Sequence, residues 1–71
     1  RKEDPAFVLE FKVYNPAKES SLEETADNAL NQIDTKRYDT VLMAKGITAE
    51  RISHLGLAFE GKRVLIKEGS R

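Results

Sequence analysis

The chain has 71 residues, enough for one small domain near the lower size limit for a self-sufficient core. Its 12 basic and 12 acidic residues cancel, which excludes a net charge that would draw the whole chain to nucleic acid or anionic lipid. It has no cysteine for disulfides or thiolate zinc sites, and no apolar run long enough to cross a bilayer. We therefore expect a soluble, cytoplasmic protein with no membrane partner.

The first predicted strand covers residues 7–14 and follows a charged lead-in. Its side chains alternate between two faces, as they do in a β-strand. One face holds Glu10 and Lys12, which stand side by side because they are two residues apart. The other face is wholly apolar and consists of Phe7, Leu9, Phe11 and Val13.

Two helices are predicted after this strand. The first begins at Ser20 or Ser21, because each serine has a glutamate three residues on, which is the spacing of a capping box. Gln32 lies at the edge of its apolar stripe. The second helix covers residues 38–45 and ends at Gly46. The stripe of the first helix is spaced for packing on a sheet and consists of Leu22, Ala26, Ala29, Leu30 and Ile33.

Two further strands are predicted at residues 52–59 and 63–67, with Glu60-Gly61 as a hairpin signal between them. The fold class is therefore α/β: a three-stranded mixed sheet in the order strand, helix, helix, strand, strand, with the helices packed on one face. The helical crossover predicts that the first and third strands run parallel and that the connection between them is right-handed. The last two strands are predicted to form an antiparallel hairpin. We predict a single domain over residues 1–71.

Glu10 and Lys12 have two interpretations. An ion pair on a half-solvated strand face is common and stabilises a protein by less than about 1 kcal/mol. Alternatively, the two residues form a hydrolytic site, in which Glu10 binds Mg²⁺ or Mn²⁺ while Lys12 activates water and offsets charge on the phosphorane. That chemistry needs the carboxylate and the ammonium on one face of a rigid element, and a strand provides such a face. The residues alone leave both interpretations open.

Other candidates for chemistry are weaker. His54 has no second histidine and no cysteine with which to complete a transition-metal site, which favours a structural or surface histidine. The dipeptides Lys36-Arg37 and Lys62-Arg63 form either a basic patch for a phosphate backbone or ordinary solvated charge.

The order of motifs, Glu10-Phe11-Lys12 on a strand followed by Gln32 and Tyr38, resembles the second half of the PD-(D/E)XK nuclease superfamily. The closer likeness is to uncharacterised bacterial and archaeal proteins in which a nuclease-like domain follows an AAA-like ATPase domain. The resemblance implies part of a restriction-endonuclease-like core. It covers nearly the whole chain, in residues 8–13, 21–24, 29–33, 36–38, 44–47 and 56–64.

The resemblance implies roles for five residues. Glu10 would be the metal-binding acid, the backbone carbonyl of Phe11 a further ligand of Mg²⁺ or Mn²⁺, and Lys12 the catalytic lysine. Gln32 and Tyr38 would assist the site or contact DNA. Their spacing is looser than the Gln-x-x-x-Tyr of the RecB-like branch, so Tyr38 matches the pattern less closely than Gln32 does.

The family pattern also requires an aspartate on the strand before Glu-x-Lys. Asp4 is the only aspartate upstream of Glu10, and it is too close in sequence to lie on a separate paired strand. We therefore expect a C-terminal fragment of a nuclease-like domain, which binds Mg²⁺ weakly or not at all and is inactive alone. The alternative is a degenerate, non-catalytic module that binds nucleic acid or a protein. Missing strands would also expose the edge of strand 7–14, which predicts a homodimer through that edge or marginal stability.

Overall fold

The computed structural model describes residues 4–69 of the chain. Its elements confirm the predicted α/β order of strand, helix, helix, strand, strand. Within residues 4–69, no helix is both long and apolar enough to cross a membrane. The elements are strand β1 (Ala6–Val13), helix α1 (Leu22–Lys36), helix α2 (Tyr38–Ala44), a short 3-10 helix η1 (Ala49–Arg51), strand β2 (Ile52–Glu60) and strand β3 (Arg63–Gly69).

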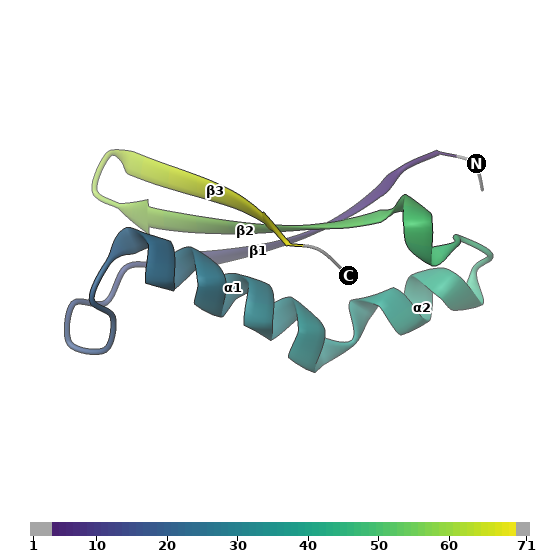
Figure 1. The fold of residues 1–71 in the computed structure, drawn as a ribbon, viewed down its shortest axis with the longest axis horizontal. Coiled ribbons are helices and arrows are strands. Elements are labelled where there is room, and N and C mark those ends of the chain that lie inside the picture. The colour runs from purple at the N-terminus through teal and green to yellow at the C-terminus, as the bar shows by residue number, and fades with distance from the viewer. Residues whose placement is uncertain (1–3, 70–71) are drawn as a thin grey trace.

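The three strands form the predicted mixed sheet, in the order β1-β2-β3 (Figure 1). β1 pairs with β2 in parallel, and β2 pairs with β3 antiparallel. The prediction that the first and third strands run parallel was wrong, because the helical crossover leads directly into β2 and the hairpin then adds β3 at the far edge. The hairpin turn is formed by Gly61 and Lys62 rather than by Glu60-Gly61, and Gly61 adopts a left-handed φ of 60° there.

Helix α1 begins where the serine pair predicted. Ser21 is the N-cap, and its hydroxyl accepts a hydrogen bond of 3.1 Å from the backbone N–H of Glu24. The Glu24 carboxylate accepts hydrogen bonds from the backbone N–H of Ser20 at 2.7 Å and from its hydroxyl at 2.8 Å. These bonds lower the pKa of Glu24. At the other end, Arg37 adopts a left-handed φ of 57°, which separates α1 from α2.

A buried carboxylate fixes the loop between β1 and α1. Glu19 accepts hydrogen bonds from the backbone N–H of Asn15 at 2.9 Å, the hydroxyl of Thr25 at 2.7 Å and the amide of Asn28 at 2.9 Å. These three bonds, that to Asn15 first, hold the pKa of Glu19 below its usual value. The loop is thereby tied to the first two turns of α1, which limits where the helix can lie over the sheet.

Both helices lie on the same face of the sheet (Figure 1). The strand register places Glu10 and Lys12 on this face, because their β2 partners are Gly56, which meets α1, and Ala58. α1 lies close to the backbone of β2 at Gly56. A Cβ atom at that position would lie 2.6 Å from the backbone oxygen of Ala26 and 3.0 Å from Cγ of Leu30. The helix therefore rests directly on the strand backbone. The fully buried or nearly fully buried side chains of this layer are Thr25, Ala26, Ala29, Ile33, Ile52 and Ala58.

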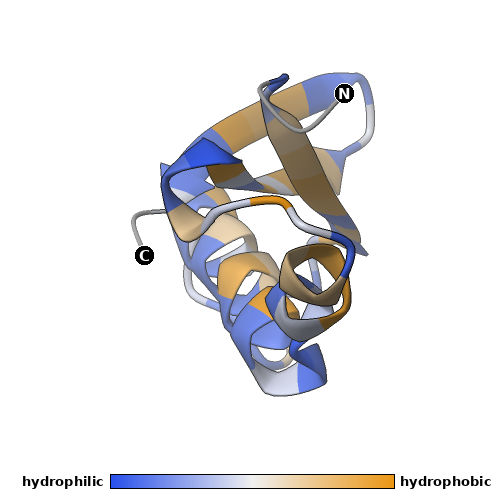
Figure 2. Ribbon diagram, turned by 90° about the vertical axis from the view of Figure 1, so that its right-hand side faces the viewer, coloured by the Kyte–Doolittle hydropathy of each residue, from blue (hydrophilic) through white to orange (hydrophobic). Residues whose placement is uncertain are grey.

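The other face of the sheet, which we call the open face, has no helix over it among residues 4–69 (Figures 1 and 2). Figure 2 shows hydrophobic positions along the strands, with α1 and α2 together on one side of the sheet. The register of the strands places nine apolar side chains on the open face. They are Phe7, Leu9, Phe11 and Val13 of β1, Leu55, Leu57 and Phe59 of β2, and Val64 and Ile66 of β3.

Gly56→Ala is expected to destabilise the fold by about 1–3 kcal/mol, because its Cβ would collide with the backbone oxygen of Ala26 and push α1 off the sheet. Chemical denaturation measures this change in the free energy of unfolding. Gly69→Ala is the matched control: its Cβ would meet only the flexible end of Leu30, 3.0 Å away at Cδ2. We expect a change within about 0.5 kcal/mol for the control. Equal stabilities of the two variants would contradict the close contact at Gly56.

Candidate nuclease site

Strand β1 presents Glu10 and Lys12 on the face that the helices cover, and both residues are half-buried. Their partners on β2 are Gly56 for Glu10 and Ala58 for Lys12. These neighbours are the two smallest residue types, so no bulky side chain of β2 stands beside the charged pair. The sheet therefore holds the carboxylate and the ammonium on one rigid strand, as the sequence predicted.

The cation that contacts Glu10 comes from helix α1. The Lys36 Nζ atom lies 3.5 Å from Oε2 of Glu10, whose side chain is 18% exposed. The sequence interpretation paired Glu10 with Lys12 instead. Lys36 takes this place because α1 runs back along β1 and its last turn lies beside Glu10. The spacing of three positions from the stripe residue Ile33 places Lys36 on a neighbouring side of the helix, but it does not say which residue of β1 Lys36 meets.

Lys36 also contacts Tyr38, the first residue of α2. Its Nζ lies 5.9 Å from the centre of the Tyr38 ring, within the range of a cation–π contact. A hydrogen bond to the Tyr38 side chain and the charge of Glu10 raise the pKa of Lys36, in that order of importance. Glu10, Lys36 and Tyr38 thus form one connected group, which the sequence predicted only in part.

The backbone of Phe11 faces the outer edge of the sheet. The backbone N–H of Tyr14 donates a hydrogen bond of 2.7 Å to the carbonyl of Phe59 on β2. Backbone groups of successive strand residues point alternately to the two sides. The groups of Lys12 therefore point to β2, and those of Phe11 point away from it. No other strand of the described chain pairs with β1 on that side, so the Phe11 carbonyl is open to a ligand.

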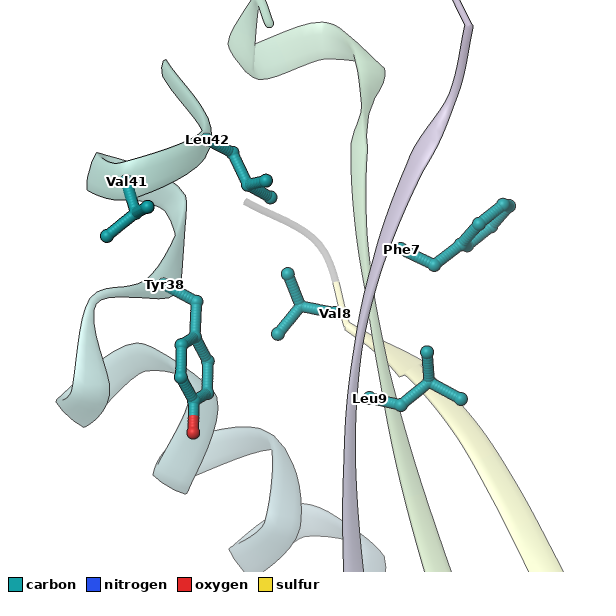
Figure 3. Close-up of a pocket in the computed structure, with 6 residues that line it drawn as sticks. All are labelled: Phe7, Val8, Leu9, Tyr38, Val41 and Leu42. Carbon is teal, nitrogen blue, oxygen red and sulfur yellow. The ribbon is translucent and has the colours of Figure 1, made fainter. Parts of the chain in front are cut away.

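Gln32 and Tyr38 occupy different positions relative to the pair. Gln32 is exposed on α1, one helical turn before Lys36 and on the same side of the helix. Tyr38 lines a hollow of about 360 Å³ between α2 and β1. Figure 3 shows Val8 directed towards Tyr38 and Leu42 in this hollow, while Phe7 and Leu9 point to the other side of β1. Lys36 therefore contacts both Tyr38 and Glu10, and Gln32 lies one turn before Lys36 on the same side of α1.

The oxygen atoms around Glu10 are of the type that binds a hard cation, but only a few are present. Glu10 and the Phe11 carbonyl offer oxygen atoms, which Mg²⁺ and Mn²⁺ prefer. Within residues 4–69, no group of three or more His, Cys, Asp or Glu side chains could hold a metal ion. Glu10 and the Phe11 carbonyl are the two protein ligands that we assign here, and water or a phosphate would have to supply the others.

His54 is a structural residue. Its side chain is only 6% exposed, and Nε2 lies 2.7 and 2.9 Å from the two carboxylate oxygens of Asp39 on α2. Its Nδ1 lies 3.6 Å from Oδ1 of Asp34, near the end of α1. The sequence predicted a structural or surface histidine but did not find these partners. His54 thereby connects β2 to both helices.

The two basic dipeptides do not form one patch. Lys36-Arg37 lies at the end of α1, whereas Lys62-Arg63 lies at the β2–β3 turn, near the beginning of α1 (Figure 1). Each also has an acidic neighbour, since Nη1 of Arg63 lies 3.1 Å from Oε1 of Glu60. Of the two interpretations from sequence, the structure favours ordinary paired and solvated charge over a continuous phosphate-binding surface.

Comparison with known families supplies the context for this geometry. Residues 1–69 match the family model of the PD-(D/E)XK nuclease superfamily. Neither a curated protein nor a solved structure matches the chain. The family match covers all but two of the 71 residues, including Glu10, Phe11, Lys12, Gln32 and Tyr38. The chain therefore belongs to the PD-(D/E)XK nuclease superfamily.

Proposed function

We propose that this chain supplies Glu10 and Lys12 to a metal-dependent site that hydrolyses phosphodiester bonds of nucleic acid, and that the chain alone has no appreciable activity. Membership of the nuclease superfamily supports the reaction class. One observation carries the proposal: Glu10 and Lys12 stand side by side on a half-buried face of β1, and the Phe11 carbonyl between them is directed to the open edge of the sheet.

Each group suits one part of such a hydrolysis. Glu10 and the Phe11 carbonyl would hold Mg²⁺ or Mn²⁺, and the bound cation would activate water and polarise the phosphate. Lys12 would donate hydrogen bonds to the attacking water or to a phosphate oxygen, where its positive charge offsets developing negative charge. Gln32 and Tyr38 would position the water or contact the nucleic-acid backbone.

The small number of ligands supports the inactivity of the chain alone. Mg²⁺ requires six ligands in near-ideal octahedral geometry and gives up its waters reluctantly. Glu10 and Phe11 would leave most of these positions to water, so the affinity for the cation should be low without a further acid or a phosphate. A site of this kind becomes competent when a second carboxylate completes it.

A non-catalytic module that binds nucleic acid or a protein is the second candidate function. The contact of Lys36 with Glu10 favours it, because an ammonium 3.5 Å from the carboxylate competes with a metal ion. A hydrogen bond to the Tyr38 side chain and then the charge of Glu10 raise the pKa of Lys36, which favours its charged form. The two candidates therefore differ in what Glu10 binds: a divalent cation in the first and the lysine in the second.

Addition of Mg²⁺ or Mn²⁺ to the 71-residue chain is expected to give weak but saturable binding at Glu10. NMR should show amide shifts with Mg²⁺ and paramagnetic broadening with Mn²⁺, both centred on residues 10–12. Glu10→Gln should remove the response, because the amide cannot replace the carboxylate charge. Glu50→Gln, at an exposed glutamate of η1, is the control and should leave it intact. A response that survives Glu10→Gln would contradict the proposed ligand.

The chain alone is expected to leave DNA and RNA uncleaved in the presence of Mg²⁺ or Mn²⁺, because the site lacks ligands. Incubation with supercoiled plasmid, single-stranded DNA and RNA, followed by gel analysis, measures this. Robust, metal-dependent cleavage that Glu10→Ala abolishes would show that the described residues suffice for catalysis and would overturn the proposed inactivity.

Lys36→Gln is expected to tighten Mn²⁺ binding by about two- to fivefold. The substitution removes a positive charge that competes with the metal for Glu10, and the interaction energy of that pair should be typical of an exposed ion pair. Broadening of the Glu10 and Lys12 amides as a function of Mn²⁺ concentration gives the affinity. Lys45→Gln, at an exposed lysine after α2, changes the net charge equally and serves as the control. Weaker binding in Lys36→Gln would show that Lys36 holds Glu10 in place for the metal.

A further inference from the structure

His54 is a buried polar side chain that the proposed hydrolysis does not use. It lines a cavity of about 270 Å³ beside the junction of α1 and α2. Its Nε2 atom lies 2.7 and 2.9 Å from the two oxygens of the Asp39 carboxylate on α2, and because a carboxylate only accepts hydrogen bonds, Nε2 carries the proton. Its Nδ1 atom lies 3.6 Å from Oδ1 of Asp34 on α1, which is too far for a hydrogen bond. The stronger attachment of His54 is therefore the one to α2.

Helix α2 depends on attachments of this kind. It has seven residues, fewer than an isolated helix needs to be stable in water. All seven are described by the structure, and none of their side chains is fully buried. Arg37, the N-cap, gives the described helix no side-chain hydrogen bond, and its φ of 57° is unfavourable for a residue other than glycine. Polar contacts such as that between His54 and Asp39 therefore matter more for α2 than for the well-buried α1.

The same helix begins with Tyr38, which belongs to the group around Glu10. Tyr38 directly precedes Asp39, the residue that His54 holds. Nζ of Lys36 lies 5.9 Å from the centre of the Tyr38 ring and 3.5 Å from Oε2 of Glu10. A hydrogen bond to the Tyr38 side chain is the largest cause that raises the pKa of Lys36, and the charge of Glu10 comes next. A chain of contacts thus leads from the buried histidine to the carboxylate of the candidate site.

We propose that His54 is a positioning residue, which keeps Tyr38 and Lys36 in place beside the candidate site by holding the beginning of α2 on β2. Loss of the contact with Asp39 frees the beginning of α2, so that Tyr38 leaves Lys36. The ammonium of Lys36 is then held less firmly beside Glu10. This arrangement of side chains needs neither metal nor nucleic acid. Its consequence for metal binding rests on the proposed function, because a cation reaches the Glu10 carboxylate more easily once Lys36 has moved.

The pKa of Lys36 tests the proposal without a metal. An NMR titration that follows the Cε and Hε signals of Lys36 in the 71-residue chain measures it. We expect the pKa to fall from its raised value in His54→Leu and in His54→Asn, since neither side chain places a donor at the position of Nε2. His54→Gln should keep the pKa raised, because its amide N–H reaches that position. A direct effect of charge has the opposite sign, since an Asp39 carboxylate without its donor favours the charged form of Lys36.

The controls separate positioning from folding. Thr40→Val replaces a hydroxyl that lines the same cavity, keeps the shape of the side chain, and should leave the pKa of Lys36 unchanged. Circular dichroism verifies that each variant is folded, and either of the two variants without the donor suffices. An unchanged or higher pKa of Lys36 in a folded variant without the donor would overturn the proposal. An equal fall in His54→Gln would overturn it as well.

The consequence for metal binding is tested by a double-mutant cycle. His54→Leu should tighten Mn²⁺ binding by about two- to fivefold, as Lys36→Gln does, and should have no further effect in the Lys36→Gln background. A full effect in that background would show that His54 does not act through Lys36 and would overturn the proposal. Absence of Mn²⁺ binding in every variant would contradict the proposed metal site instead, and the titration of Lys36 would still decide the role of His54.

Discussion

The contact of helix α1 with the backbone of β2 at Gly56 is the constraint on which the rest of the structure depends. A side chain at this position would collide with the backbone oxygen of Ala26, so the helix can lie this close only because the strand has a glycine there. The contact lies on the face of the sheet that the helices cover. Because α1 lies on the face of Gly56, it also lies over Glu10, the β1 partner of Gly56.

Strand β1 consequently has different surroundings on its two faces. On the helix side, the last turn of α1 brings Lys36 to Glu10, and Tyr38 at the beginning of α2 completes the group. On the other side, the aromatic and aliphatic side chains of β1 remain exposed. Phe11 belongs to both surfaces: its backbone carbonyl is directed to the edge beside Glu10, and its ring stacks on Phe59 in the open face. A partner on the open face would therefore restrict the strand that carries the proposed metal ligands.

Much of the fold could be predicted from sequence because local rules govern it. The serine pair indicated the start of α1, Gly46 indicated the end of α2, and alternation assigned the side chains of β1 to two faces. The relative direction of β1 and β3 was wrongly predicted, since it depends on which strand the helical crossover enters. Alternation also says which residues share a face but not which face the helices cover. In the structure the helices cover the face on which α1 meets Gly56.

The candidate site was predictable to a similar extent. Glu10 and Lys12 could be placed side by side from their spacing, and the family match supports their assignment to a nuclease superfamily domain. The partners of Glu10 and His54 could not be found this way, because Lys36 and Asp39 are brought to them by tertiary packing. Such contacts are set by the distance between helix and sheet, which a pattern along the chain does not contain.

The face to which α1 packs is tested most directly by nuclear Overhauser effects between side chains of the helix and the strands. The account predicts cross-peaks from the methyl groups of Ala26 and Leu30 to the Hα protons of Gly56, and none from the rings of Phe7 or Phe11 to α1. Cross-peaks between the Phe11 ring and the Ala29 or Ile33 methyl groups would contradict it. They would place the helices on the open face and leave Glu10 and Lys12 in solvent.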